Sequence, residues 1–166
     1  FNELTGALAA RRDPGAFFKA KRLEQDERHQ RYQETPYSLE PNCKESPGGF
    51  RDLHVILWVA RAARFGTSWR GLADRYLLTT EELRHIRQAE NFLRLARIRL
   101  HYIARRKEER LLFDHQEKLA QAFKLQATAS KRASEVLMQR YFRNARFVTQ
   151  LNTILLQNIG VRLFPA

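Results

Sequence analysis

Two basic side chains, Lys44 and Arg51, stand on either side of a Pro-Gly-Gly turn at residues 47–49. Glycine lets a backbone turn sharply or approach a ligand closely, and a preceding proline stiffens the entry to such a turn. The apolar run that begins at Leu53 predicts a helix directly after the turn. Cations around the start of a helix are suited to holding an anion. We therefore interpret the turn as a candidate anion site, with an ordinary charged linker as the alternative.

Helices are expected to position this turn, because apolar residues recur at three-to-four spacing along almost the whole sequence. Pro36 should end the first helix, and a short extended segment is expected near residues 37–40. Helices joined by short turns predict an all-α fold, a helical bundle. The expected helices cover residues 17–33, 50–64, 68–75, 80–106, 114–123 and 130–161.

Several helix ends carry specific signals. Thr79 and Glu82 have the spacing of a capping box, and Asp114 is expected to cap the next helix. Gly160 is expected to close the last helix. Asn144 is the one polar position in the apolar seam of that helix, and we expect it to make a core hydrogen bond. Trp58 is interpreted as a core or interface residue.

Composition restricts the class of protein. The 166 residues are 43% hydrophobic and 29% charged, which is typical of a globular domain. A single cysteine, Cys43, cannot form an internal disulfide, and no apolar run is long enough for a membrane span, so a cytoplasmic location is expected. The net charge is +12, and all of the excess lies in residues 51–166, with 22 bases against 10 acids. This balance favours an anionic partner.

Residues 39–52 resemble a segment of bacterial protein-PII uridylyltransferase/uridylyl-removing enzymes, with Phe50 where that family has leucine. A looser resemblance to glutamine synthetase adenylyltransferases exists. Glu109 replaces an aspartate of the uridylyltransferase pattern, in a further matching segment. The matching segments outside the turn are 28–32, 92–101, 109–116 and 138–145.

The resemblance implies a function for the parent enzyme. UMP would pass from UTP to a tyrosine of protein PII with Mg²⁺ neutralising the phosphates, and a separate domain would remove it. Neither catalytic centre is recognisable here, because no Gly-Ser turn is followed by Asp-x-Asp and no His-Asp pair occurs. We therefore expect an internal piece of an enzyme that has no catalytic residues, no metal site and no cofactor of its own. Residues 1–36 would be a lead-in from the missing transferase domain, and 37–166 a bundle like a nucleotidyltransferase substrate-binding domain.

The resemblance also suggests roles within the turn. Lys44 and Arg51 would neutralise phosphate charge, and Gly48 and Gly49 would allow close backbone approach. Asn42 could read the base or the ribose. The acids Glu40 and Asp52 could orient Arg51 or assist at the metal, whereas the structural alternative is an ion pair between Glu40 and Arg51 that holds the turn.

Two other classes of function stay open. The nine bases between Arg84 and Arg110 could form a nucleic-acid-binding face, although the sequence has no recognition helix or stacking platform and a nucleic-acid partner is not expected. A polar edge formed by Glu90, Arg94, Arg97 and His101 could face either a ligand or solvent. Alternatively, the bundle is a structural spacer. The expected partners are protein PII, UTP and the transferase and hydrolase domains of the parent enzyme, with no membrane.

Overall fold

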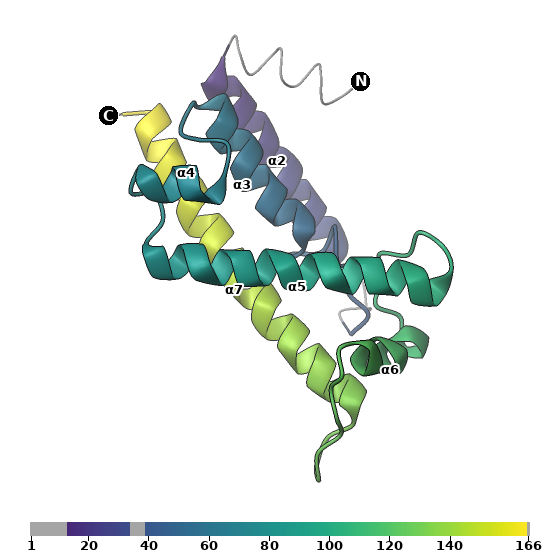
Figure 1. The fold of residues 1–166 in the computed structure, drawn as a ribbon. Helices are drawn as coiled ribbons and strands as arrows, with labels where there is room; N and C mark the ends of the chain where they lie inside the picture. Colours follow the sequence, from purple (N-terminus) through teal and green to yellow (C-terminus); the bar gives the residue numbers. More distant parts are fainter. Residues whose placement is uncertain (1–12, 34–38, 166) are drawn as a thin grey trace.

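The computed structural model describes residues 13–33 and 39–165, and this part of the chain forms six helices (Figure 1). No strand occurs among the described residues, where Asn42 and Arg110 form one isolated antiparallel bridge. The prediction of an all-α bundle is confirmed. Of the expected extended segment, residues 37–38 lie outside the described part, and residues 39–40 form a turn and a bend. The helices are α2 (Pro14–Gln33), α3 (Phe50–Ala62), α4 (Trp69–Asp74), α5 (Thr80–Ala104), α6 (Phe113–Ala122) and α7 (Ala133–Leu163).

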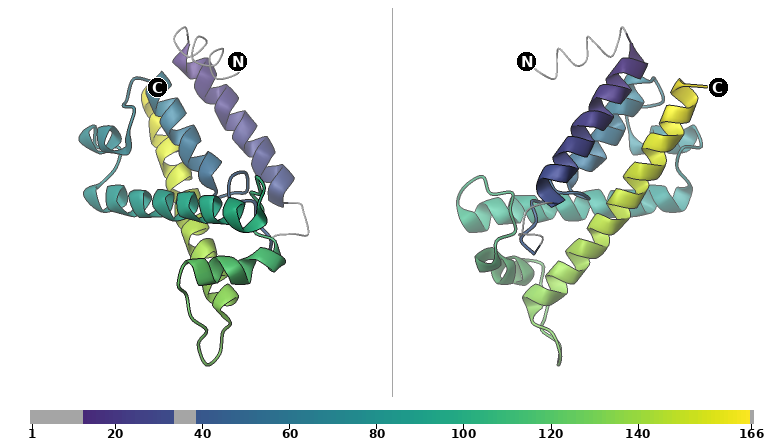
Figure 2. Two further views of the ribbon diagram at one scale, coloured as in Figure 1. Left: turned by 45° about the vertical axis from the view of Figure 1, so that its right-hand side comes forward. Right: turned by 180° about the vertical axis from the view of Figure 1, so that it is seen from behind.

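The longest helix, α7, is the support on which the other helices pack. α2 and α3 lie side by side against one half of α7, and α6 packs on the other half (Figure 2). α5 runs across α3 and α7, with the short α4 beside it (Figures 1 and 2). The turn at residues 41–49 connects to the start of α3, next to the crossing of these helices. The helices therefore hold the turn from several sides.

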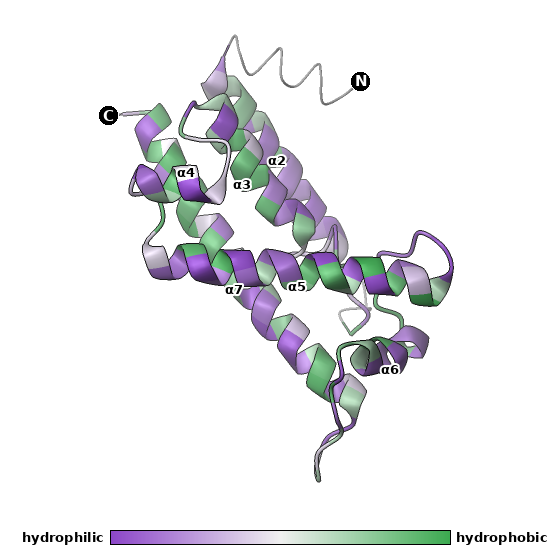
Figure 3. Ribbon diagram, in the orientation of Figure 1, coloured by the Kyte–Doolittle hydropathy of each residue, from purple (hydrophilic) through white to green (hydrophobic). Residues whose placement is uncertain are grey.

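The apolar stripes that the sequence predicts for the two longest helices, α5 and α7, are largely buried. On α5 the buried residues include Leu83, Ile86, Leu93 and Leu100, and the hydrophobic and hydrophilic colours alternate along this helix in Figure 3. On α7 the predicted seam is buried as well, from Leu137 through Tyr141, Val148 and Leu151 to Leu155. Trp58 is partly buried against the core, as expected. No helix in the described ranges combines the length and apolarity that a bilayer span requires.

The helix ends agree with the sequence where the capping residues are local. The capping box of Thr79 and Glu82 is present, and the Ser68 hydroxyl accepts from the Gly71 N–H at the start of α4. Two predictions are wrong. α6 begins one residue before the expected cap, and the carboxylate of the distant Glu40 accepts from the Phe113 N–H at 2.8 Å. α7 continues through Gly160, where an added Cβ would lie 3.0 Å from the Phe18 ring.

Asn144 also differs from its prediction. Its amide nitrogen is buried and has no hydrogen-bond partner within the described part of the chain, as is true of the Tyr141 hydroxyl one turn earlier. The expected core hydrogen bond is therefore wrong for this nitrogen. The hydrogen-bonded core amide of α7 is Asn152, two turns further along. Period alone places a polar residue on the inner face of a helix, but the facing residues decide which amide finds an acceptor.

Candidate functional site

The backbone of the turn is bonded to the chain itself. Every backbone N–H between residues 42 and 52 donates to an acceptor in the protein, and Pro47 has none to donate. The first amides of α3 are included, since Phe50 donates to the Cys43 carbonyl and Arg51 to the Lys44 carbonyl. A helix start binds an anion through free N–H groups. Any anion bound here would therefore have to be held by side chains.

The two glycines have internal neighbours that explain their presence. Gly48 has φ +82°, and an added Cβ would lie 2.6 Å from the Cα of Ala145 on α7. A Cβ at Gly49 would lie 2.7 Å from the Cys43 carbonyl oxygen. Both positions thus need glycine so that the turn can fold onto itself and onto α7. Their approach to a ligand stays a prediction.

Asp52 closes the inner side of the turn. Its carboxylate is fully buried and accepts from Arg28 at 2.6 Å, from His29 at 2.9 Å and from the Gly48 N–H at 2.8 Å. Burial alone would raise the pKa of Asp52, but the hydrogen bond from His29 and the charge of Arg28 outweigh it and hold that pKa below its ordinary value. Asp52 therefore binds Arg28 and His29. The sequence led us to expect that it could orient Arg51, whose carboxylate partner is instead Glu45.

The same network fastens α2 and α7 to the turn. The Arg28 guanidinium also donates to the Glu45 carbonyl at 2.9 Å, so that one side chain of α2 holds both ends of the turn. Asn152 of α7 exchanges hydrogen bonds with Gln25 and donates to the Asp52 carbonyl at 2.9 Å. These contacts give a physical reason for the resemblance at residues 28–32, which supply the partners of the turn.

The polar residues before the turn have structural partners of their own. The Asn42 side-chain oxygen accepts from the Lys44 and Glu45 N–H groups, a local turn motif that shapes the backbone. Glu40 contacts the first amide of α6, as described above, and no ion pair joins it to Arg51 in the described part of the chain. The partner of Arg51 is Glu45, at 3.0 Å. The alternative ion pair is therefore assigned to the wrong acid. The reading of a base by Asn42 stays a prediction.

The outer side of the turn carries cations that are only partly satisfied. The Arg51 side chain is 26% exposed, and its Nε atom is buried without a hydrogen-bond partner in the described residues. Its guanidinium lies 5.7 Å from the Trp58 ring. No carboxylate within the described ranges forms an ion pair with the half-buried Lys44 ammonium. Lys44 and Arg51 are neighbours through the backbone, since the Arg51 N–H donates to the Lys44 carbonyl. Neither side chain is among the donors to the Asp52 carboxylate, and we call their side of the turn the outer side.

Sequence reasoning missed His54, one turn after Arg51 on α3. Burial lowers the pKa of His54 below its ordinary value, and the positive charges of Arg51, Arg97 and Lys44 lower it further, against an opposing effect of Glu90. The imidazole packs edge-on against the Phe50 ring, with centroids 4.4 Å apart. The four-residue spacing of Phe50, His54 and Trp58 could have revealed this face of α3.

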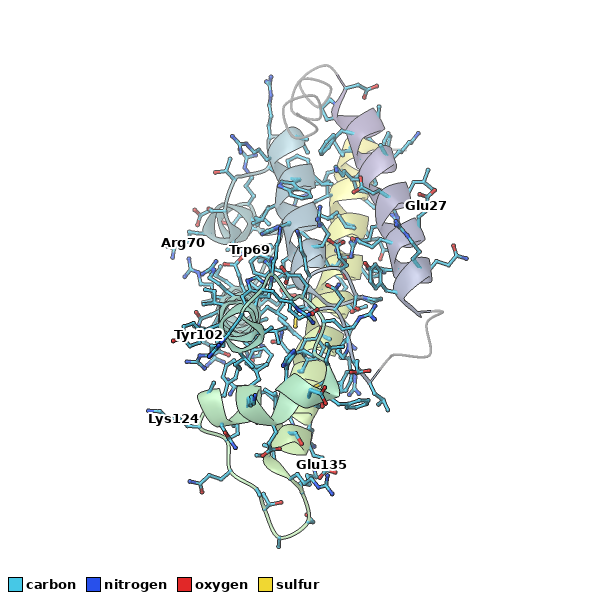
Figure 4. All side chains as sticks on the ribbon, turned by 90° about the vertical axis from the view of Figure 1, so that its right-hand side faces the viewer. Glu27, Trp69, Arg70, Tyr102, Lys124 and Glu135 are labelled. Atoms are coloured by element: carbon cyan, nitrogen blue, oxygen red, sulfur yellow. The ribbon has the colours of Figure 1, made fainter. Side chains whose placement is uncertain are left out.

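The predicted polar edge of α5 is an ion-pair network. Arg97 binds Glu109 through two bonds of 2.7 Å, and His101 lies 3.2 Å from the same carboxylate. Burial alone would raise the pKa of Glu109, but the hydrogen bond and charge of Arg97 hold it below its ordinary value. Arg94 pairs with Glu90, which also accepts from the Trp69 indole between α4 and α5 (Figure 4). The Arg97 guanidinium of this edge also lies 5.0 Å from the Phe50 ring, which packs against His54.

The residues described here do not provide a metal centre. Residues 13–33 and 39–165 hold no group of three or more His, Cys, Asp or Glu side chains that could bind an ion. The acids nearest the turn, Glu40, Glu45 and Asp52, are each engaged with donors of the protein. They do not fit a Mg²⁺ site.

The fold and the turn define an all-α domain with a buried ion pair between Arg28 and Asp52 and with the cations Lys44 and Arg51 on the outer side of the turn. The sequence model described as GlnD PII-uridylyltransferase matches residues 16–156, and the chain belongs to this family. It is 59% identical over 165 residues to a bifunctional uridylyltransferase/uridylyl-removing enzyme of Aromatoleum aromaticum, covering 99% of this chain and 19% of that protein. The protein of the same name from Bordetella parapertussis is 59% identical over 98% of this chain and 19% of its own length.

A third relative of that name, from Burkholderia mallei, is 58% identical over 93% of this chain and 18% of its own length. The chain thus spans about a fifth of the curated relatives that it matches. No solved structure matches it.

Proposed function

We propose that this chain is the helical domain of an enzyme that transfers UMP from UTP to a tyrosine of protein PII and removes it again. The observation that carries the proposal is the identity of 59% over 99% of the chain to a bifunctional uridylyltransferase/uridylyl-removing enzyme. The catalytic carboxylates and their Mg²⁺ would belong to a transferase domain outside these residues. With one cysteine and no internal disulfide, we assign the enzyme to the cytoplasm.

Within that enzyme, the outer side of the turn would form one wall of the cleft for the nucleotide and PII. Lys44 and Arg51 project from a backbone that is fixed by its own hydrogen bonds, so their charges are pre-positioned. Arg51 presents a guanidinium, whose planar donors match phosphate oxygens. Its contact would stabilise the charge that develops on the phosphates during transfer.

The test is UMP incorporation into PII by the complete protein that carries this chain. Arg51→Ala should lower kcat/KM about 30-fold to 1,000-fold, because a lost contact to transition-state charge costs about 2–4 kcal/mol. Arg61→Ala is the matched control, since Arg61 is an exposed arginine near the other end of α3. Unchanged transfer by folded Arg51→Ala would contradict the phosphate role. The 166 residues alone should incorporate no UMP.

A spacer function is the second candidate, and a specific observation favours it. All the backbone donors of the turn, and both glycines, serve contacts within the protein. If the turn is structural only, variants on its outer side should transfer UMP normally, and variants on its inner side should lose activity through unfolding. The Arg51→Ala experiment therefore separates the two candidates.

A further inference from the structure

The face of α3 next to the turn carries three rings at four-residue spacing. His54 lies between Phe50 and Trp58, with ring centroids 4.4 Å and 5.5 Å away. These contacts fix the orientation of the imidazole, because Phe50 is buried and Trp58 packs on the core. His54 itself is half-buried. It is therefore a rigid, partly accessible polar group in an otherwise aromatic row.

Charged groups of the turn, α3 and α5 act electrostatically on His54, and Lys21 of α2 lies 5.1 Å from the neighbouring Trp58 ring. Lys44 comes from the turn and Arg51 from α3, whereas Arg97 and Glu90 come from α5. The two arginines also lie over the neighbouring rings, Arg97 5.0 Å from Phe50 and Arg51 5.7 Å from Trp58. The imidazole thus lies among cations, two of which already have a carboxylate partner, Arg51 with Glu45 and Arg97 with Glu109. The remaining carboxylate, Glu90, is bonded to Trp69 and Arg94.

Hydrogen-bond donors in this cluster are left unused. The Arg51 Nε atom is buried without an acceptor, and the Lys44 ammonium has no ion pair within the described ranges. Neither ring nitrogen of His54 has a hydrogen-bond partner in the same part of the chain. A buried donor without an acceptor costs free energy. Of these groups only the Arg51 Nε atom is fully buried, and an anion bound beside it would supply the missing acceptor.

We propose that Lys44, Arg51 and His54, supported by Arg97, bind the phosphate groups of a nucleotide or of pyrophosphate, and that His54 takes up a proton from solvent when the anion binds. This inference rests on the proposed function for the nature of the anion. It adds His54 as a binding residue and makes binding depend on pH. No covalent bond forms or breaks.

The direction of the pH dependence follows from the surroundings of His54. In the free protein, burial and the neighbouring cations hold the pKa of His54 below its ordinary value of 6.5, so the imidazole is neutral at pH 7. A bound anion offsets those cations and raises that pKa. Affinity should therefore increase as the pH falls through the pKa of the bound state, and should level off below the pKa of the free state.

The experiment is calorimetric titration of the complete protein with inorganic pyrophosphate and, separately, with UTP, in EDTA at pH 6 and pH 8. Two buffers with different ionisation enthalpies report the protons taken up. Because pyrophosphate also titrates in this range, the measured quantity is the difference between the wild type and His54→Gln. The matched control is His85→Gln, which changes a half-buried histidine that packs on Phe147 of α7.

Wild type and His85→Gln should both take up a proton and bind pyrophosphate several-fold more tightly at pH 6 than His54→Gln does, and this difference should be smaller at pH 8. Lys44→Gln should bind more weakly at both pH values and still take up the proton. If His54→Gln fails to fold, Lys44→Gln still tests whether pyrophosphate binds at this site. Identical binding and proton uptake by His54→Gln and the wild type would overturn the inference, as would no binding of either probe.

The two proposals can fail separately. UMP transfer to PII with no proton uptake at His54 would contradict this inference and leave the proposed function intact. Proton-linked binding of pyrophosphate by a protein that transfers no UMP would contradict the proposed function alone. Binding of UTP but not pyrophosphate would overturn the inference, since the site is defined by phosphate charge.

Discussion

Asp52 and Arg51 are neighbours in the sequence and opposites in the structure. The Asp52 carboxylate is fully buried and has three donors, Arg28, His29 and the Gly48 N–H. The Arg51 side chain is 26% exposed, with one carboxylate partner and one unused buried nitrogen. The inner side of the turn is saturated, and the outer side is not. The comparison separates residues that close the turn from residues that remain available to a ligand.

The two sides also differ in which elements they join. The inner network connects α2, α3 and α7 through Arg28, Gln25 and Asn152. The outer cluster lies between the turn and α5, and Figure 4 shows the Tyr102 edge of α5 on the side of the molecule away from Glu27 of α2. Changes on the inner side should therefore affect stability, whereas changes on the outer side should affect binding.

Asp52→Asn should give the largest loss of stability. Removing one partner of a buried ion pair leaves the other charge uncompensated and costs about 3–5 kcal/mol. Urea unfolding at pH 7 measures the loss. Asp74→Asn is the control, because Asp74 is 67% exposed and pairs with Arg70 at 3.4 Å, so its change should cost less than about 0.5 kcal/mol. Equal losses in the two variants would contradict a structural role for the inner side.

The same variant predicts a dependence on pH. The pKa of Asp52 is lowered in the folded state, so its stabilising contribution is fully present above its ordinary value of 3.8. The contribution is lost as the pH falls through the folded-state pKa. The difference in unfolding free energy between wild type and Asp52→Asn should therefore be constant from pH 5 to pH 7 and shrink below about pH 4. A difference that stays constant down to pH 2 would contradict this assignment.

Gly48→Ala should cost about 3 kcal/mol of unfolding free energy. The residue has φ +82°, where a side chain is strained, and an added Cβ meets backbone atoms of Ala145 that cannot move aside. Gly71→Ala is the matched control. Its nearest neighbour would be the Ser68 hydroxyl at an ordinary 3.4 Å, so little change is expected. A loss below 1 kcal/mol for Gly48→Ala, measured by urea unfolding, would show that the turn can move away from α7.

The helices could be predicted from the sequence because their signals are local. Apolar spacing and the Thr79 capping box identify α5 and its first residue, and the buried seam of α7 follows from its period. The ends that failed depend on residues far away in the sequence. Glu40 accepts from the first amide of α6, and Phe18 of α2 packs where a side chain at Gly160 would lie. No local pattern contains that information.

The site could be predicted only in part, for the same reason. Residue types at 40–52 identify a turn rich in charge, but not which charge faces which side. Asp52 has a partner 24 positions earlier in the sequence, and Glu109 and Arg97 meet across 12 positions. The role of His54 could not be predicted, because an isolated histidine on a helix indicates no particular role until its neighbours are known. Placement in space, rather than composition, separates the structural acid from the available cations.

Arg51→Gln should have only a small effect on stability, and Arg28→Gln is its counterpart on the inner side. Arg51 pairs with Glu45 near the surface, where such pairs contribute about 0–1 kcal/mol, whereas Arg28 is the partner of a buried carboxylate and should cost several times more. Urea unfolding of both variants at pH 7 measures the difference. An equal loss in the two variants would mean that the outer side also holds the turn together. In that case the unused donors around His54 would be unsatisfied groups of a structural contact, and the spacer function would be the better account of this domain.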